Sequence, residues 1–403
     1  MNLYLKTTTA LLALLFLVGC QKDDSDDTPD PEAKKSEWYQ IVSFDTLTSS
    51  QVIQGFAGFG ADIGQDLVRV SFLYHSPYDT ATLTLSGCVC WPVGLKECSK
   101  IWLENHFTTI RWDQCPSQMG QPGMVISIIQ NTIYIGADYQ GLGLSRDLPQ
   151  PYFNTVLTAD QSIDCFRAAL SLLNEWGPNI PDDYSTYCIG YSLGGAVTLG
   201  IARRAELDPE VKRLLNLKKS YCGDGPYNME TMIDFFFSDT SKPLEYPISL
   251  PCAIRTALYA SPLLNSSYTE SDFFSDAFMD SGLLELLDTK EYDTDQMNEI
   301  LNNSGFNTTG SILSKEVLNP DSQIARQFYH ELKLVDLTSG WSPTTPIWLF
   351  HAKKDDTVPV ACLEKLLDNM EGNPNISYYI KPSGNHHESG TDFYTSVLLG
   401  VRL

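Results

Sequence analysis

The segment CIGYSLGGAV, residues 188 to 197, constrains the fold of this chain most, because it places one serine in a ring of glycines. The residues before Ser192 are typical of a strand, and those from Leu193 onward are typical of a helix. Glycine lets a backbone double back where a side chain would clash. Two interpretations follow: an ordinary glycine-rich turn, or a nucleophilic Ser192 held on a sharp strand-to-helix turn.

Short β-rich runs alternate with amphipathic helices from Trp38 onward. An apolar stripe predicts a helix from Thr158 to Trp176, where Thr158 and Gln161 suggest a capping box. Strands that alternate with helices imply an α/β fold, a mostly parallel sheet with helices on both faces. The first two strands are expected to be antiparallel. The segments with predicted strands are 66–76, 81–93, 100–107, 131–139, 184–192, 218–228, 345–356 and 376–387.

The alternation stops between residues 229 and 337, where apolar helical stretches follow one another without clear strands. We expect a helical cap insertion at about 227–340, over the sheet edge where catalytic loops gather. Its aromatic residues either line an acyl pocket or fill the core of the cap itself. These residues are Phe235, Phe236, Phe273, Phe274 and Phe278.

A serine hydroxyl is a weak nucleophile that needs a base to take its proton and a carboxylate to orient that base. Beyond residue 340 the sequence has three histidines, at positions 351, 386 and 387. The strand PIWLF is followed by HAKKDDTVP, and the strand SYYIK is followed by PSGNHHESG. Serine, aspartate and histidine thus occur in this order, each just after a strand, which favours a nucleophilic Ser192.

The segments GYSLGG, HAKKDDTVP and SGNHH resemble the three catalytic segments of α/β-hydrolases. ADYQGLGLSRDLPQPY, ADQSIDCFRAAL and CGDGPYNMETM are similar to the secretory lipase-like branch, so that the resemblance spans residues 66–403. It implies an α/β-hydrolase fold with Asp355 as the acid and His386 as the base. Ala352 replaces the usual glycine of the acid segment, which leaves Asp356 as the alternative, and His387 is the alternative base.

An oxyanion intermediate requires two N–H donors. The resemblance places one at the backbone of Leu193, directly after the nucleophile. The second is expected from the turn after IWLENHFTT, at Thr108. His106 resembles the histidine of the His-Gly segment of this family, although Phe107 replaces the glycine.

The first twenty residues, MNLYLKTTTALLALLFLVGC, read as a signal peptide, because the apolar run from Ala10 to Val18 is too short to span a membrane. LVGC resembles a bacterial lipobox, which predicts that Cys20 is lipid-modified; a secretory signal with a chance cysteine is the alternative. Residues 21–37 then form an acidic tether that resembles a surface-export signal, and residues 38–403 form the hydrolase domain. We expect a lipid-anchored protein of the bacterial cell envelope, exposed at the outer membrane.

The chain has 27 basic and 50 acidic residues, and a net charge of −23 argues against nucleic acid as a partner. In an oxidising compartment, one or two disulfides are possible among four cysteines that are close in sequence. Neither these cysteines nor His386-His387-Glu388 has a second ligand pair at metal-binding spacing, so no metal and no cofactor are expected. The four cysteines are Cys88, Cys90, Cys98 and Cys115.

These observations together predict a serine hydrolase that cleaves carboxylic esters, small or carried on an acylated glycan, through an acyl-enzyme intermediate. The first alternative is a serine peptidase related to prolyl oligopeptidases, which have the same order of residues. The second alternative is a surface lipoprotein that binds glycans or lipids on a decayed hydrolase fold. The acyl and alcohol groups of the substrate are left open by the sequence.

Overall fold

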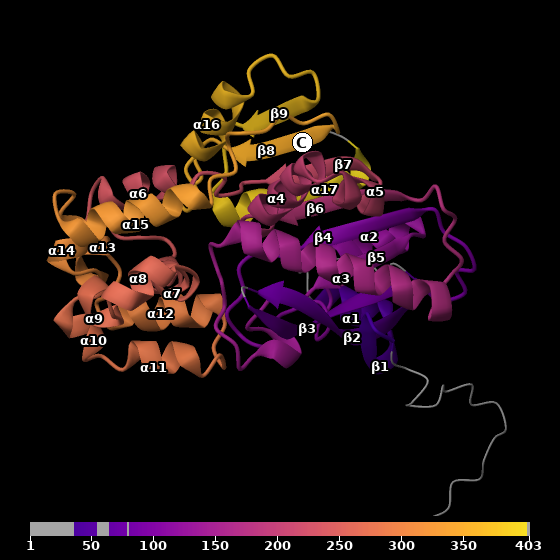
Figure 1. The fold of residues 1–403 in the computed structure, drawn as a ribbon, viewed down its shortest axis with the longest axis horizontal. Coiled ribbons are helices and arrows are strands. Elements are labelled where there is room, and N and C mark those ends of the chain that lie inside the picture. Colours follow the sequence, from indigo (N-terminus) through magenta and orange to yellow (C-terminus); the bar gives the residue numbers. More distant parts are fainter. Residues whose placement is uncertain (1–35, 55–63, 79, 401–403) are drawn as a thin grey trace, which may run out of the picture. The chain divides into compact units, whose positions relative to one another are not determined.

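A nine-stranded sheet in the order β1-β2-β3-β5-β4-β6-β7-β8-β9 forms the centre of the protein in a computed structural model that describes residues 36–54, 64–78 and 80–400 (Figure 1). Strands β1 to β3 are antiparallel, β3 pairs antiparallel with β5, and all further pairs are parallel. The strands are Tyr39–Leu47 (β1), Leu67–Tyr78 (β2), Ala81–Pro92 (β3), Lys100–Asn105 (β4), Ile133–Ala137 (β5), Ser185–Tyr191 (β6), Leu217–Gly223 (β7), Ile347–Ala352 (β8) and Ile376–Lys381 (β9).

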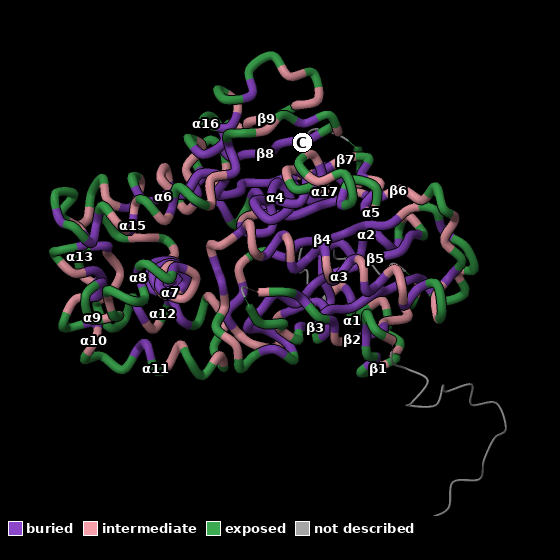
Figure 2. Tube along the Cα trace, in the orientation of Figure 1, coloured by how far each residue is buried: buried purple, intermediate pink, exposed green. Residues whose placement is uncertain are grey.

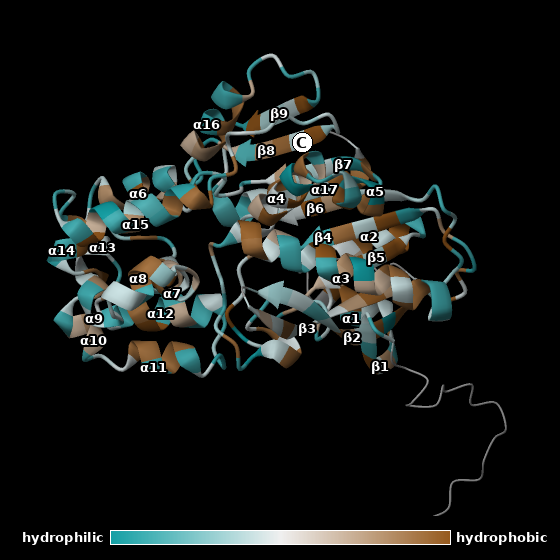
Figure 3. Cartoon of the chain, in the orientation of Figure 1, coloured by the Kyte–Doolittle hydropathy of each residue, from teal (hydrophilic) through white to brown (hydrophobic). Residues whose placement is uncertain are grey.

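Helices cover both faces of this sheet, so that its central strands are buried on each side (Figure 2). In β4, Ile101 and Leu103 pack into the core below α3 and α4, whereas Trp102 packs on the opposite face with residues of α2 and α17. The helices carry stripes of hydrophobic residues (Figure 3), as expected for elements with one buried side. One face has α1 (Ser49–Gln54), α2 (Pro122–Gln130) and α17 (His386–Leu399), and the other has α3 (Thr155–Trp176), α4 (Leu193–Leu207), α5 (Pro209–Leu215) and α16 (Ala361–Asn369).

The predicted α/β architecture is therefore confirmed, with a difference at the start of α3. This helix begins at Thr155, and the Asn154 side chain caps it by accepting a hydrogen bond from the Leu157 N–H at 3.1 Å. The capping box expected at Thr158 and Gln161 is wrong, because both residues lie inside the helix. Asparagine is as good an N-cap as serine or threonine, and the apolar stripe alone did not reveal the extra turn.

The chain between β7 and β8, which is described throughout, is helical (Figure 1). Its helices lie beyond the carboxyl ends of these two strands and form the cap insertion. They are Met229–Phe237 (α6), Ser249–Ala260 (α7), Pro262–Ser267 (α8), Glu270–Phe273 (α9), Asp276–Met279 (α10), Leu283–Asp288 (α11), Thr294–Asn303 (α12), Thr309–Ile312 (α13), Lys315–Leu318 (α14) and Gln323–Leu334 (α15). A short 3-10 helix, Gly143–Ser145, follows β5.

Aromatic side chains of the cap pack against one another. The ring of Phe273 lies 5.6 Å from that of Phe328, and the ring of Phe278 lies 5.2 Å from that of Phe274 and 5.1 Å from that of Phe306. Of the two roles considered for the five aromatic residues at 235, 236, 273, 274 and 278, the structure supports the role in the core of the cap. Interlocked rings of this kind hold the short helices together.

Lys290, between α11 and α12, connects the cap to the loop that follows β5. Its Nζ donates hydrogen bonds to the carbonyl oxygens of Gly141, Arg146 and Leu148 at 2.9, 2.5 and 2.7 Å. Burial lowers the pKa of Lys290 to about 8. We expect Lys290→Met to lower the free energy of unfolding by about 2 kcal/mol, because hydrogen bonds from a charged donor are lost. Chemical denaturation measures this change.

Lys333→Met is the matched control, since it removes a lysine of the same cap at an exposed position. The Lys333 Nζ lies 3.1 Å from Glu230 Oε1, and 57% of the lysine side chain is exposed. Such a surface ion pair contributes less than about 1 kcal/mol. Equal losses of stability in the two variants would contradict the anchoring role of Lys290.

The cysteines pack as small apolar side chains. All nine cysteines within the described residues are buried, and none of them forms a disulfide there. The Sγ atoms of Cys88 and Cys90 lie 4.0 Å apart, while the Sγ atoms of Cys98 and Cys115 face main-chain carbonyls. The disulfides considered possible among these four cysteines are therefore absent. The four side chains instead fill apolar space in the sheet and its turns.

The predicted signal peptide, Cys20 and most of the acidic tether lie outside the described residues. Among the helices that the structure does describe, none combines the length and the apolar run needed to cross a lipid bilayer.

Candidate active site

Ser192 lies on a sharp turn between β6 and α4, with φ 57° and ψ −125°. This φ is unusual for a residue with a side chain and marks backbone strain at the turn. Two glycines allow the turn to form. A Cβ at Gly190 would lie 2.1 Å from the Gly194 carbonyl oxygen, and a Cβ at Gly194 would lie 2.0 Å from the Asn105 carbonyl oxygen. The glycines around Ser192 are therefore required by close backbone approach.

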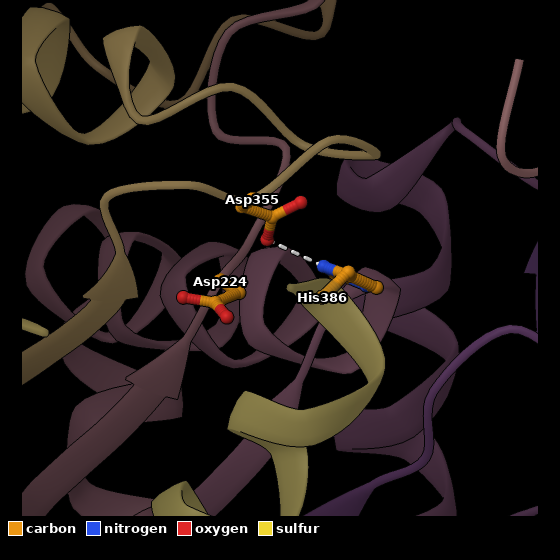
Figure 4. Close-up of side chains that lie close together, drawn as sticks. All are labelled: Asp224, Asp355 and His386. Carbon is orange, nitrogen blue, oxygen red and sulfur yellow. Dashed lines mark hydrogen bonds and ion pairs between the residues drawn. The ribbon is translucent and has the colours of Figure 1, made fainter. Parts of the chain in front are cut away.

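Three side chains from separate parts of the sequence form a hydrogen-bonded chain at this turn. The Ser192 Oγ lies 2.8 Å from His386 Nε2, and His386 Nδ1 lies 2.6 Å from Asp355 Oδ2. Figure 4 shows the contact between the histidine and the aspartate. Asp355 follows β8, and His386 is the first residue of α17. The structure thus brings together the three residues predicted as nucleophile, acid and base.

The neighbouring candidates lie elsewhere. The ring of His387 is exposed, and its Nδ1 lies 3.2 Å from the hydroxyl oxygen of Tyr246. Asp356 is exposed, whereas Asp355 is buried. The remaining histidine, His351, is buried and donates a hydrogen bond from Nε2 to the Val358 carbonyl oxygen at 2.9 Å.

The surroundings of His386 suit a group that gains and loses a proton. Burial lowers the pKa of His386, but the neighbouring acidic residues, Asp355 foremost, together raise it, so that its pKa lies above the ordinary value. The other oxygen of Asp355, Oδ1, accepts hydrogen bonds from the N–H groups of Thr357 and Val358 at 2.9 and 2.7 Å. These bonds orient the carboxylate toward the imidazole.

Leu193 and Thr108, predicted to supply N–H donors to an oxyanion, border the same cavity as Ser192. Leu193 is the first residue of α4, and the first N–H groups of a helix have no acceptor within it. The Thr108 Oγ1 lies 3.1 Å from the hydroxyl oxygen of Tyr152. That the N–H groups of these two residues donate hydrogen bonds to a substrate oxygen stays a prediction.

His106 stabilises the turn that carries Thr108. Its Nδ1 lies 2.8 Å from the Phe107 carbonyl oxygen, and its ring stacks on that of Tyr139 with centroids 3.9 Å apart. Burial lowers the pKa of His106, which favours the neutral ring. These contacts indicate a structural role for His106 beside the site.

A cavity of about 380 Å³ opens above Ser192. The hydrolase domain contributes an apolar wall with several aromatic rings, and the cap contributes mostly polar residues. None of the five phenylalanines expected as candidate pocket residues borders this cavity, and none of its described lining residues is lysine or arginine. The hydrolase domain supplies Phe107, Tyr152, Phe153, Tyr191, Val358 and Tyr394, among others, and the cap supplies Met232, Tyr246, Ser249, Asp293, Thr294 and Asp295.

Sequence reasoning missed Asp224, whose buried carboxyl group lies beside His386 and Asp355 (Figure 4). One polar atom from each of these three residues lies within 4.8 Å of the other two. Such a cluster is a possible metal site, but the His386 Nδ1 already bonds to Asp355. Asp224 directly follows β7, just as Asp355 follows β8 by a few residues. The position of an aspartate directly after a predicted strand was the sequence signal that could have identified Asp224.

The sheet, the turn at Ser192 and the cap together define an α/β-hydrolase fold. The chain is similar to the rice cell wall degrading esterase LipA from Xanthomonas oryzae, with a TM-score of 0.72 and 20% identity over 89% of this chain and 96% of that one. It is also similar to a Legionella pneumophila protein, with a TM-score of 0.72 and 18% identity over 89% and 96% of the two chains. Candida antarctica lipase A has a TM-score of 0.59 and 15% identity over 90% and 83%.

Sequence comparison adds no family to this structural likeness. No protein-family model matches the chain, and no curated protein matches it by sequence. At identities of 20% or below, the similar structures establish the fold, and the function rests on the site itself.

Proposed function

We propose that this protein is a serine hydrolase that cleaves carboxylic esters through an acyl-enzyme intermediate. The observation that carries the proposal is the continuous hydrogen-bonded chain from Ser192 through His386 to Asp355 at the floor of a cavity. A hydroxyl next to a neutral imidazole, which is itself oriented by a carboxylate, is the arrangement needed to activate a serine.

In the first half of the reaction, the Ser192 Oγ attacks the ester carbonyl carbon and its proton passes to His386 Nε2. The tetrahedral intermediate then collapses: the bond to the alcohol oxygen breaks, and His386 returns the proton to that oxygen. In the second half, a water molecule attacks the acyl-serine and gives its proton to the same nitrogen. Release of the carboxylic acid restores the Ser192 hydroxyl. Asp355 stabilises the imidazolium ion in both halves.

The negative charge on the former carbonyl oxygen requires N–H donors, for which we propose Leu193 and Thr108. The position of Leu193 at the start of α4 supports this role, because the helix dipole favours a negative charge there. Cap residues such as Met232 and Tyr246 border the cavity, and water that a bound substrate displaces from it would no longer weaken these interactions.

For the substrate, we propose a small ester or an acylated glycan. An esterase and a lipase among the similar structures support an ester, and the first of these is a rice cell wall degrading esterase. The cover over the site is built of helices rather than of a β-rich domain, which favours an esterase over a peptidase of the prolyl oligopeptidase type. We further propose, from the sequence alone, that Cys20 carries a lipid anchor at the outer membrane.

A fluorophosphonate probe tests the proposal because it labels activated serines. The wild-type protein should be labelled and inactivated, and labelling should be absent from Ser192→Ala. A panel of p-nitrophenyl esters, with acetylated and feruloylated sugars included, would then identify the acyl and alcohol groups. Absence of labelling together with glycan binding would favour the non-enzymatic alternative.

The charge of the cavity leads to a prediction about specificity. Asp293 and Asp295 border the cavity without a lysine or arginine among the described lining residues, and Asp293 forms an ion pair with Arg111 at 3.8 Å. We expect an ester with a terminal carboxylate on its acyl chain to have about tenfold lower kcat/KM than the uncharged ester of equal length, because like charges repel. Asp295→Asn should narrow this difference.

Measurements at low and high salt check the electrostatic origin, since the difference should shrink as salt screens it. Asp276→Asn is the matched control, because Asp276 is an exposed residue of the cap that does not border the cavity. A preference for the anionic ester would contradict the prediction.

A further inference from the structure

The carboxyl group of Asp224 is fully buried and has no role in the reaction described above. Its Oδ1 accepts a hydrogen bond from the Ala352 N–H at 2.9 Å. Its Oδ2 lies 2.5 Å from the hydroxyl oxygen of Tyr191 and 2.6 Å from that of Ser389. Both hydroxyl groups also contact the start of α17, where His386 lies. Asp224 is therefore part of a network that reaches the main chain of the catalytic base.

The protons in this network can be counted. The hydroxyl oxygen of Tyr191 lies 2.5 Å from Asp224 Oδ2 and also 2.5 Å from the carbonyl oxygen of His386. Each contact is a hydrogen bond only if a proton lies between the two oxygens. Tyr191 has one proton, and a carbonyl oxygen has none. Ser389 also has one proton, with two acceptors in reach: Asp224 Oδ2 at 2.6 Å and the Asn385 carbonyl oxygen at 2.8 Å.

An ionised Asp224 would leave one of the two short contacts of Tyr191 without a proton. If Tyr191 donated to Asp224, two oxygens with lone pairs would face each other at 2.5 Å at the His386 carbonyl. If Tyr191 instead donated to the His386 carbonyl oxygen, its hydroxyl oxygen would face the charged Asp224 carboxylate without a proton between them, and these two oxygens would repel each other. A proton on Asp224 Oδ2 removes the conflict, because Asp224 then donates to Tyr191 and Tyr191 donates to His386.

We propose that Asp224 is a protonated carboxylic acid in the working enzyme, and that it positions His386 through the Tyr191 hydroxyl. Asp224 is thus a positioning residue for the base, and this role rests on the proposed function. The carboxyl group remains neutral while Asp355 alone carries the charge that faces the imidazole.

The charges around Asp224 agree with this assignment. Burial raises the pKa of Asp224, and the nearby Asp355 carboxylate raises it further. The two histidines, His351 and His386, lower this pKa, but the net result is a raised value. Two carboxyl groups this close to each other do not readily ionise together.

His351 is the strongest influence toward a charged Asp224, ahead of His386. Its Nδ1 lies 3.7 Å from Asp224 Oδ1, which is too long for a hydrogen bond. Its Nε2 proton is donated to the Val358 carbonyl oxygen. Among the described residues the ring thus makes a hydrogen bond through Nε2 only, and its buried Nδ1 has no hydrogen-bond partner.

The first test compares two substitutions of Asp224. An asparagine retains the acceptor for Ala352 and places an N–H donor toward Tyr191, whereas an alanine removes both. We expect Asp224→Ala to lower kcat for a p-nitrophenyl ester by about tenfold or more through misplacement of the base, with KM little changed, and Asp224→Asn to restore it to within about threefold of wild type. The matched variant Asp355→Asn should lose about 10⁴-fold.

The pH profile adds a second reading to the same variants. Since a neutral Asp224 adds no charge next to His386, Asp224→Asn should leave the midpoint of the acid limb of kcat/KM unchanged. A loss in Asp224→Asn as large as in Asp355→Asn, or a downward shift of that midpoint, would overturn the proposal.

Two further measurements need no activity and therefore separate this proposal from the proposed function. The infrared spectrum of the wild type should contain the C=O stretch of a buried carboxylic acid at pH 7, and Asp224→Asn should lack it. Absence of this band would overturn the protonated state, whether or not any ester is cleaved.

Stability against pH gives the second of these measurements. The unfolded chain loses the Asp224 proton above pH of about 4, whereas the folded protein keeps it. The stability that a raised pKa contributes is therefore lost as pH rises, so that Asp224→Asn should gain stability relative to wild type between pH 4 and 7. A relative loss over this range would show an ionised Asp224 and overturn the proposal.

Discussion

Alanine at position 192 is expected to lower kcat/KM for carboxylic esters by about 10⁴-fold or more, because the reaction then has no nucleophile and proceeds through the oxyanion site and binding alone. The Ser192 Oγ lies 2.8 Å from the base, and no other hydroxyl is joined to His386 Nε2 among the described residues. Steady-state kinetics with a short-chain p-nitrophenyl ester measures the loss, and circular dichroism verifies that the variant is folded.

Ser249→Ala is the matched control for this variant. Ser249 also borders the cavity, but it belongs to cap helix α7. Its replacement should change kcat/KM by less than about tenfold, as expected for a residue that touches the substrate without reacting. An Ser192→Ala enzyme with more than a tenth of the wild-type rate would show that another group is the nucleophile.

Glutamine at position 386 should cause a loss of similar size, about 10⁴-fold, because Ser192 then has no base. The same substitution at His387 should cost less than about tenfold. The two histidines are adjacent in sequence, yet one contacts Ser192 and Asp355 while the other is exposed beside Tyr246. Because the same substitution is made at both positions, a difference in activity between the two variants reports where the histidine lies and not the loss of a histidine as such.

The pH dependence of the wild type checks the same assignment. His386 must be neutral to accept the serine proton, and the Asp355 carboxylate keeps its pKa above the ordinary value. Activity should therefore fall as pH decreases through a midpoint above about 6.5. His387→Gln should retain this midpoint. Equal losses in the two glutamine variants would contradict the choice of His386.

The hydrolase domain could be predicted from sequence because its signals are local and strong. A buried parallel strand such as IWLEN is a continuous apolar run, and the turn at Ser192 needs glycine at positions that the pattern displays. The order of the three catalytic segments fits neighbouring strand ends. The structure brings Ser192, Asp355 and His386 together, and their catalytic roles are predictions that the variants above test.

The parts that sequence did not reveal depend on packing between distant segments. Asp224 contacts Tyr191, Ala352 and Ser389 from three other elements, so no local pattern identifies its network. The same holds for the cavity residues of the cap. In sequence, Phe273 and Phe278 fit either a pocket or the core of the cap, because the partners that place them in the core, Phe328 and Phe306, lie far along the chain.

The cap begins and ends at two strands that are paired side by side, with Gly223 of β7 opposite Phe350 of β8. Its two ends are therefore neighbours in space whatever lies between them. The entropy of closing such a loop grows only slowly with its length, so an insert here can be lengthened, shortened or exchanged with little effect on the sheet. Substrate range in a fold of this kind can therefore change by replacement of this one insert, while Asp355 and His386 keep their places after β8 and β9.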